Sequence, residues 1–160
     1  MRIFLLILGF CCFAPAKAED SVPVYNFKQL QERVLQKNDT LYVVNFWATW
    51  CKPCVEEMPR FEAIRQLFWD KAIKFIFVSQ DSKKSGVKVA QFMAANNYPS
   101  EAFILSAGNP NIWIDEIDPK WSGTIPATVL YKNGKKLDFK EGEFVAQIDL
   151  EYFIQANLKE

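Results

Sequence analysis

Two cysteines separated by two residues, Cys51 and Cys54, have the type and spacing that indicate chemistry in this chain. Such a pair can form a redox-active disulfide, half of a zinc site or a structural crosslink. A disulfide that spans two residues closes a very small loop, so it gives little entropic stabilisation. A zinc site needs further ligands, and the chain has no histidine. The spacing therefore favours a redox-active dithiol that exchanges disulfides with a partner.

The composition narrows the possible functions. The chain has 160 residues, of which 50% are hydrophobic and 14 are Phe, and this suits one folded domain with a core. Without histidine, Ser-His-Asp hydrolases, Cys-His proteases and His-ligated zinc or haem sites are excluded. Lys+Arg and Asp+Glu balance at 19 each, so no basic excess indicates nucleic acid as a partner. We expect no metal and no dissociable cofactor, because the sulfurs themselves hold the electrons.

Residues 1–18 have the features of a secretory signal peptide. Arg2 gives the positive start, an apolar run follows, and Ala16-Lys17-Ala18 provides the small-x-small pattern after which signal peptidase cuts. The apolar run is shorter than the roughly 20 residues that span a bilayer. We therefore expect residues 19–160 to form an exported domain, in the periplasm or an equivalent compartment.

Two alternatives exist for this N-terminal segment. It can be an ordinary buried part of the fold, or a lipid anchor attached at Cys11 or Cys12. Lipidation is disfavoured because Phe10, and not a small residue, precedes Cys11. Cleavage after Ala18 leaves Cys51 and Cys54 as the two cysteines of the mature domain.

Residue patterns predict alternating strands and helices along the chain. β-Branched and aromatic runs indicate buried strands, apolar residues spaced three or four apart indicate amphipathic helices, and Asn133-Gly134 indicates a hairpin turn. Strands are predicted over residues 22–25, 41–48, 73–80, 102–105, 127–131 and 136–139, and helices over residues 27–37, 51–69, 87–97 and 143–158. This order predicts an α/β sheet covered by helices on both faces.

The apolar residues also predict which face of the last two helices is buried. For residues 87–97 the inward positions are expected to be Val87, Ala90, Phe92 and Ala94. For residues 143–158 they are expected to be Phe144, Ile148, Tyr152 and Phe153. Residues 106–120 are less regular, and we expect one helical turn there.

The cysteine pair lies where the strand over residues 41–48 meets the following helix. Unpaired N–H groups and the helix dipole favour negative charge at such a helix start, so they favour the Cys51 thiolate, which is the nucleophile. Cys54 lies one turn further on, within reach of a mixed disulfide at Cys51. Pro53 is tolerated in the first turn, and Trp50 is expected to flank the sulfur and limit approach to it.

Two motifs resemble those of thioredoxin-fold proteins, most closely the exported TlpA/ResA-like thiol–disulfide oxidoreductases. The first is the segment over residues 45–59, which reads Asn-Phe-Trp-Ala-Thr-Trp-Cys-Lys-Pro-Cys-Val-Glu-Glu-Met-Pro. The second is Thr124-Ile125-Pro126, followed by the hairpin Asn133-Gly134-Lys135. The resemblance implies a thioredoxin-like fold, with a central mixed sheet and helices on both faces.

The resemblance also implies roles for further residues. Pro126 is expected to be a cis-proline beside the cysteines, which leaves the backbone of Ile125 free to pair with an extended substrate. Thioredoxin has a buried aspartate where this chain has Asn45, so that proton acceptor is absent. Glu57, three residues after the second cysteine, matches the acid of the TlpA/ResA-like group and is expected to accept the proton of Cys54. A solvated carboxylate is the alternative for Glu57.

The expected activity is that of a protein-disulfide reductase. Cys51 attacks a substrate disulfide and Cys54 resolves the mixed disulfide, with apocytochrome c maturation as one setting. The partners are then protein thiols and disulfides, together with a membrane thiol–disulfide relay as electron donor, and we expect a monomer. A disulfide oxidase or isomerase of the same fold, or a binding module without turnover, are the alternatives. A thiol peroxidase is disfavoured, because that chemistry usually needs a threonine and an arginine beside the nucleophile. Thr49 is near the pair, but the first arginine after it is Arg60, and no arginine lies just before it.

Overall fold

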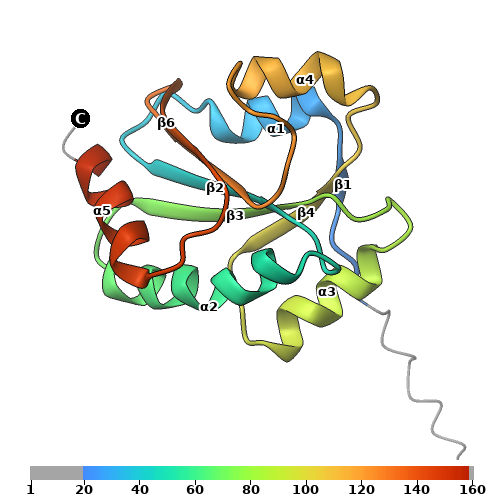
Figure 1. The fold of residues 1–160 in the computed structure, drawn as a ribbon, viewed down its shortest axis with the longest axis horizontal. Helices are drawn as coiled ribbons and strands as arrows, with labels where there is room; N and C mark the ends of the chain where they lie inside the picture. Colours follow the sequence, from blue (N-terminus) through green and yellow to red (C-terminus); the bar gives the residue numbers. More distant parts are fainter. Residues whose placement is uncertain (1–19, 159–160) are drawn as a thin grey trace, which may run out of the picture.

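The computed structural model describes residues 20–158 (Figure 1). The expected signal peptide, with Cys11 and Cys12, lies outside these residues. The elements in chain order are β1 (Val24–Tyr25), α1 (Phe27–Val34), β2 (Leu41–Trp47), α2 (Lys52–Leu67), β3 (Ile73–Ser79), α3 (Gly86–Ala95), β4 (Glu101–Leu105), α4 (Pro110–Ile117), β5 (Ala127–Lys132), β6 (Lys135–Glu141) and α5 (Gln147–Leu158). No helix within residues 20–158 is both long and apolar enough to cross a membrane.

The six strands form one mixed sheet in the order β1-β4-β3-β2-β5-β6. The first four strands of this order are parallel, whereas β5 pairs antiparallel with both β2 and β6. β2 lies inside the sheet with all seven residues buried, as its continuous apolar and aromatic run predicts. The hairpin turn between β5 and β6 has positive φ at Asn133 and Gly134, as a type I′ turn requires.

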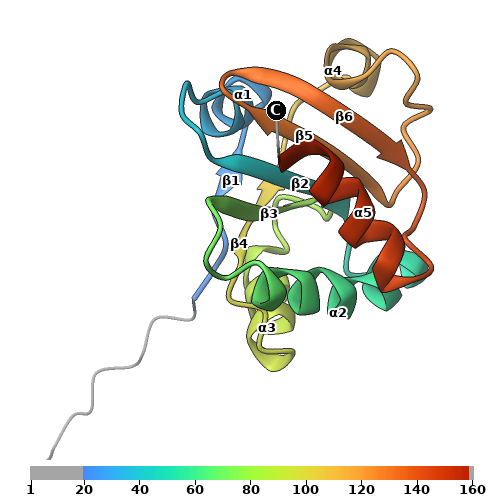
Figure 2. The ribbon, with the colours of Figure 1, turned by 90° about the vertical axis from the view of Figure 1, so that its left-hand side faces the viewer.

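Helices cover both faces of the sheet, as predicted. Helices α1 and α4 lie on one face, and α2, α3 and α5 lie on the other (Figures 1 and 2). Each face has its own buried cluster. The cluster under α2, α3 and α5 includes Trp47, Met58, Phe61, Phe77, Val89, Phe144, Leu150 and Ile154. The cluster under α1 and α4 includes Leu30, Val44, Phe46, Ile76, Phe103, Trp113, Ile117 and Trp121.

Helix starts follow the local sequence. Asn26 caps α1 by accepting from the N–H of Gln29, whose side chain accepts in return from the N–H of Asn26. This reciprocal pair is a capping box. α2 begins directly after Cys51, which is its N-cap residue, and the helix continues through Pro59 to Leu67.

Two predicted helix faces are correct only in part, because Phe92 and Phe153 pack against the core as expected whereas the fully buried residues of both helices differ from the predicted ones. In α3 the buried residues are Gly86, Val89 and Met93, and Ala94 is exposed. The helix begins one residue earlier than predicted, and its buried stripe runs along a different face.

α5 begins at Gln147, later than predicted, and buries Leu150 and Ile154. Ile148 and Tyr152 are 49% and 65% exposed. Phe144 is buried as expected, but from the loop before the helix. The prediction that the helix includes Phe144 wrongly put Ile148 and Tyr152 on the buried face, whereas Phe153 packs against the core as expected.

Candidate active site

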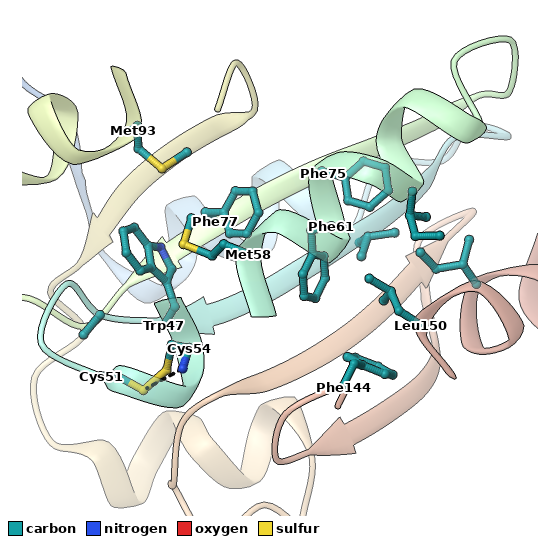
Figure 3. Close-up of a cluster of buried hydrophobic side chains, with 14 of the residues drawn as sticks. Trp47, Cys51, Cys54, Met58, Phe61, Phe75, Phe77, Met93, Phe144 and Leu150 are labelled. Atoms are coloured by element: carbon teal, nitrogen blue, oxygen red, sulfur yellow. Dashed lines mark hydrogen bonds between the residues drawn. A yellow bond between two sulfur atoms is a disulfide. The ribbon is translucent and has the colours of Figure 1, made fainter. Parts of the chain in front are cut away.

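Cys51 and Cys54 form a disulfide at the start of α2, with their Cα atoms 5.3 Å apart. Cys51 is 6% exposed and Cys54 is fully buried. The N–H of Cys54 lies 3.4 Å from the Sγ atom of Cys51 and donates to it (Figure 3). The N-terminal end of the helix is therefore directed at the Cys51 sulfur, where a thiolate develops when the disulfide is reduced.

The residues on either side of Cys51 are open to solvent. Trp50 is 66% exposed, so its ring is available to a partner beside the sulfur. The side chain of Lys52 is 85% exposed and its Nζ lies 3.6 Å from a carboxylate oxygen of Glu56. Arg60 donates to the backbone carbonyl of Glu56. Water and Glu56 thus weaken the effect of the Lys52 charge on the sulfur.

A buried aspartate fixes the loop before Cys51. The carboxylate of Asp81, just beyond the end of β3, accepts from the N–H of Thr49 at 2.9 Å and from its hydroxyl at 2.7 Å. It also accepts from the hydroxyl of Ser79 at 2.8 Å. These bonds connect the loop that follows β2 to the C-terminal end of the neighbouring strand β3, just before the cysteines. Asp81 was not among the predicted site residues, because its only signal in the sequence is that a polar residue follows a predicted strand.

The loop before β5 approaches the cysteines from the other side. The peptide bond between Ile125 and Pro126 is cis, as predicted. The Sγ atom of Cys51 lies 3.8 Å from the carbonyl oxygen of Ile125. The structure thus brings together the cysteine pair and the second motif, which are more than 70 residues apart in the chain.

A second carboxylate holds this loop. Glu141, the last residue of β6, accepts from the backbone N–H groups and the hydroxyls of Ser122 and Thr124. These bonds hold the pKa of Glu141 below its usual value. The indole of Trp121 donates to the Thr124 carbonyl at 2.8 Å. No sequence pattern indicates this role for Glu141, because the contact depends on the β5–β6 register.

Glu57 lies in α2 and is fully buried, so the alternative of a solvated carboxylate is wrong. One carboxylate oxygen accepts from the side-chain N–H of Asn45 at 2.8 Å, and the other accepts from the backbone N–H of Phe144 at 2.9 Å. Glu57 follows Cys54 by three residues in α2, so both side chains lie on the same side of the helix. The carboxylate therefore links α2, β2 and the segment that leads into α5.

Burial raises the pKa of Glu57 to about 7. Loss of solvation is the main cause, and the nearby Glu143 carboxylate acts in the same direction. The hydrogen bonds from Phe144 and Asn45, together with the charge of Lys140, oppose the rise. Glu57 therefore changes charge near neutral pH, where a proton acceptor for a thiol is useful.

Residues 106–120 contain the two-turn helix α4, where one turn was expected. Trp113 is buried against Phe27 and Phe46 on the α1 face of the sheet. Trp113 is therefore a core residue. Ile112, by contrast, is 65% exposed.

The family model for Redoxin matches residues 17–112 of the chain. The chain belongs to the Redoxin family. This redoxin is 35% identical over 69 residues to the thiol-disulfide oxidoreductase ResA of Oceanobacillus iheyensis, a match that covers 39% of the chain and 36% of that relative. It is 25% identical over 105 residues to the sporulation thiol-disulfide oxidoreductase A of Bacillus subtilis, covering 60% of the chain and 64% of the relative. The redoxin thus spans between about one third and two thirds of the length of these curated relatives.

Solved structures identify the fold of this redoxin as thioredoxin-like. A thioredoxin-related protein from Neisseria meningitidis superposes with a TM-score of 0.63 at 20% identity, covering 78% of this chain and 89% of the other. The predicted α/β class, with a mixed sheet between two helical layers, is confirmed.

Proposed function

We propose that this redoxin is an exported thiol–disulfide oxidoreductase that reduces disulfides in partner proteins. The observation that carries the proposal is the Cys51–Cys54 disulfide at the start of α2, with the Cys51 sulfur 3.8 Å from the Ile125 carbonyl. Two of the relatives that the chain matches are named thiol-disulfide oxidoreductases, and this supports thiol–disulfide exchange as the chemistry.

The reaction follows from the positions of the two sulfurs. In the reduced protein the Cys51 thiolate attacks one sulfur of a substrate disulfide, so the substrate S–S bond breaks, the other substrate sulfur leaves as a thiolate, and a mixed disulfide forms. Cys54 loses its proton and attacks the Cys51 sulfur, which releases the second substrate sulfur as a thiolate. The Cys51–Cys54 disulfide forms, and two electrons have moved to the substrate, which takes up protons as its thiols form.

Glu57 is proposed as the proton acceptor for Cys54. A thiol buried beside apolar groups loses its proton with difficulty. Cys54 is fully buried, so its sulfur is not in contact with bulk water that could accept the proton. Glu57 is buried one helical turn from Cys54, and its pKa of about 7 lets it hold a proton and release it near neutral pH. The raised pKa supports a proton-transfer role, because an ordinary surface glutamate is ionised throughout this range.

Trp50, Ile125 and Pro126 are proposed to position the substrate. The 66% exposure of Trp50 gives a partner an aromatic surface next to the sulfur. The backbone of Ile125, adjacent to Cys51, offers an edge along which an extended segment can pair. Main-chain pairing of this kind accepts many sequences, which suits an enzyme that acts on several proteins.

The surroundings of Cys51 support the reductase direction. Strongly oxidising dithiols owe their potential to a stabilised reduced form. Lys52 is 85% exposed and is paired with Glu56, so it adds little stabilisation to a Cys51 thiolate beyond that of the helix start. An oxidase or isomerase of the same fold is the alternative direction.

Export and electron supply complete the proposal. The signal-like residues 1–18 support secretion of a domain over residues 19–160. In an oxidising compartment a reductase must be re-reduced, so a membrane thiol–disulfide relay is the proposed donor. Protein disulfides, including those of apocytochrome c, are the proposed substrates of a monomeric enzyme.

Trapping of mixed disulfides tests the proposal. Cys54→Ser removes the resolving sulfur, so the variant is expected to accumulate partner proteins on Cys51 that dithiothreitol releases. Cys51→Ser is the matched control and is expected to trap far fewer. A binding module without turnover would instead retain its partners without a covalent bond in both variants, and that result would contradict the proposed activity.

A further inference from the structure

Asn45 has an unusual hydrogen-bonding state next to Glu57. It lies in β2 on the sheet face that α2 covers, and it is 1% exposed. Its side-chain nitrogen donates to the Glu57 carboxylate at 2.8 Å and to the hydroxyl oxygen of Thr128 at 3.1 Å. Its own buried side-chain oxygen has no hydrogen-bond partner among residues 20–158.

This orientation of the amide depends on the charge of Glu57. Turned by 180°, the amide would direct its oxygen at an ionised carboxylate, and two acceptors would face each other. The observed orientation is therefore the one that an ionised Glu57 favours. It leaves the Asn45 oxygen without a hydrogen bond, which is unfavourable for a buried polar atom. Once Glu57 binds a proton, its O–H becomes a donor that an amide oxygen can accept.

Thr128 can take part in the reversed arrangement as well. It is fully buried and lies directly opposite Asn45 in the β2–β5 pairing. A hydroxyl can both accept and donate. In the present state it accepts from Asn45, and after reversal it can donate to the Asn45 oxygen, whose second lone pair accepts from protonated Glu57.

We propose that Asn45 is the positioning residue for Glu57, and that its amide, paired with Thr128, reverses when Glu57 takes up a proton. In each state the amide serves both neighbours: its two N–H groups donate to ionised Glu57 and to Thr128, and after reversal its two oxygen lone pairs accept from protonated Glu57 and from Thr128. The role of this positioning in catalysis rests on the proposed function, in which Glu57 exchanges a proton with Cys54.

The short distance between the two side chains also explains why an amide suits this position. An aspartate at position 45 would place a second carboxyl group in hydrogen-bond contact with Glu57, and two such groups share a single proton near neutral pH. With an amide at this position, the site has one titrating acid with a single midpoint. Other charges that act on Glu57 are Glu143 and Lys140, which oppose each other.

Titration of Glu57 by NMR of carboxyl-labelled oxidised protein tests the proposal directly. In Asn45→Leu the pKa of Glu57 is expected to rise by about one unit, because a bond to the charged acid is stronger than one to the neutral acid. Asn157→Leu removes another buried amide, in α5, and is expected to leave the titration unchanged. An unchanged midpoint in folded Asn45→Leu would overturn the positioning role.

Asn45→Asp provides a second variant of nearly the same shape. Two interacting carboxyls are expected to replace the single titration by two separated steps, the upper one above the wild-type midpoint. A single step at the wild-type midpoint would count against the proposal.

The reversal has its own signature. Nuclear Overhauser contacts from the Asn45 side-chain NH₂ to Thr128 are expected above the Glu57 midpoint and are expected to disappear below it. Contacts of equal strength at both pH values would overturn the reversal.

The pH profile of disulfide exchange separates this inference from the proposed function. We expect its midpoint to move with the Glu57 pKa in Asn45→Leu. If the Glu57 titration moves while the exchange profile does not, the Asn45–Glu57 coupling stands and the role of Glu57 in catalysis is wrong.

Discussion

The sulfur of Cys51 lies 3.8 Å from the backbone carbonyl oxygen of Ile125. The antiparallel pairing of β2 with β5 brings the two residues together, because Cys51 follows the end of β2 and Ile125 precedes the start of β5. A partner that brings its sulfur to Cys51 must therefore run alongside the Ile125 backbone. The position of the loop that carries Ile125 is consequently part of substrate binding.

Glu141→Ala is expected to weaken partner binding. The carboxylate accepts four hydrogen bonds from Ser122 and Thr124, so its removal frees the loop that leads to Ile125. We expect KM for a protein disulfide to rise about three- to tenfold, since 1.4 kcal/mol corresponds to a factor of ten, with kcat changed much less. Steady-state reduction of a disulfide substrate measures both constants.

Glu151→Ala is the control for this prediction. Glu151 lies in α5 and contacts Gln155 on the surface, so its removal is expected to leave KM unchanged. A Glu141→Ala enzyme with wild-type KM would show that the loop needs no anchor.

The charge state of Glu57 is expected to make stability depend on pH. Its pKa is about 7 in the folded protein, against an ordinary value of 4.5, so the folded state binds the proton more tightly than the unfolded chain does. The resulting stabilisation is complete below about pH 4.5 and is lost as the pH rises through 7. Glu57→Gln removes this pH-dependent contribution to stability, because glutamine does not titrate.

Urea unfolding of both proteins from pH 4 to pH 8 measures the effect. The wild type is expected to lose about 3 kcal/mol relative to Glu57→Gln over this range, at 1.36 kcal/mol per pKa unit. Parallel stability curves would mean that Glu57 titrates normally.

Asp81→Ala is expected to destabilise the fold and loosen the loop before Cys51. It leaves the N–H and hydroxyl of Thr49 and the hydroxyl of Ser79 without their acceptor. Unsatisfied buried groups cost about 1–3 kcal/mol, which urea denaturation can resolve. Asp81→Asn is expected to reduce the stability of the fold less than Asp81→Ala does. The asparagine oxygen can still accept a hydrogen bond, and the Thr49 hydroxyl can rotate to accept one from the asparagine NH₂.

Asp115→Ala, at an exposed position of α4, is the control and is expected to change stability little. Equal effects at Asp81 and Asp115 would contradict the structural role of the Asp81 bonds.

The parts of the fold that the sequence predicted are those with a local signal. The run Leu41–Trp47 is buried because it is apolar throughout, and the Cys51 and Cys54 spacing places both sulfurs at one helix start. The α5 stripe was mispredicted because Phe144 is buried from a loop, which periodicity cannot distinguish from a helix.

The polar bonds of the site depended on tertiary structure. Glu57 meets Phe144 across 87 residues, and Asn45 meets Thr128 through the register of β2 and β5. Neither contact has a sequence signal in a single chain. The spacing of Glu57 from Cys54 was enough to predict Glu57 as a site residue. Its burial and its hydrogen bonds could not be predicted, because they depend on the tertiary structure.

The reduction potential of the Cys51–Cys54 pair tests the proposed reductase most directly. It can be measured by equilibrating residues 19–160 against dithiothreitol and glutathione buffers and counting free thiols. A potential at or below about −250 mV, close to that of thioredoxin, is the predicted result. A value between about −180 and −120 mV, where isomerases and strong oxidants lie, would contradict the reductase direction.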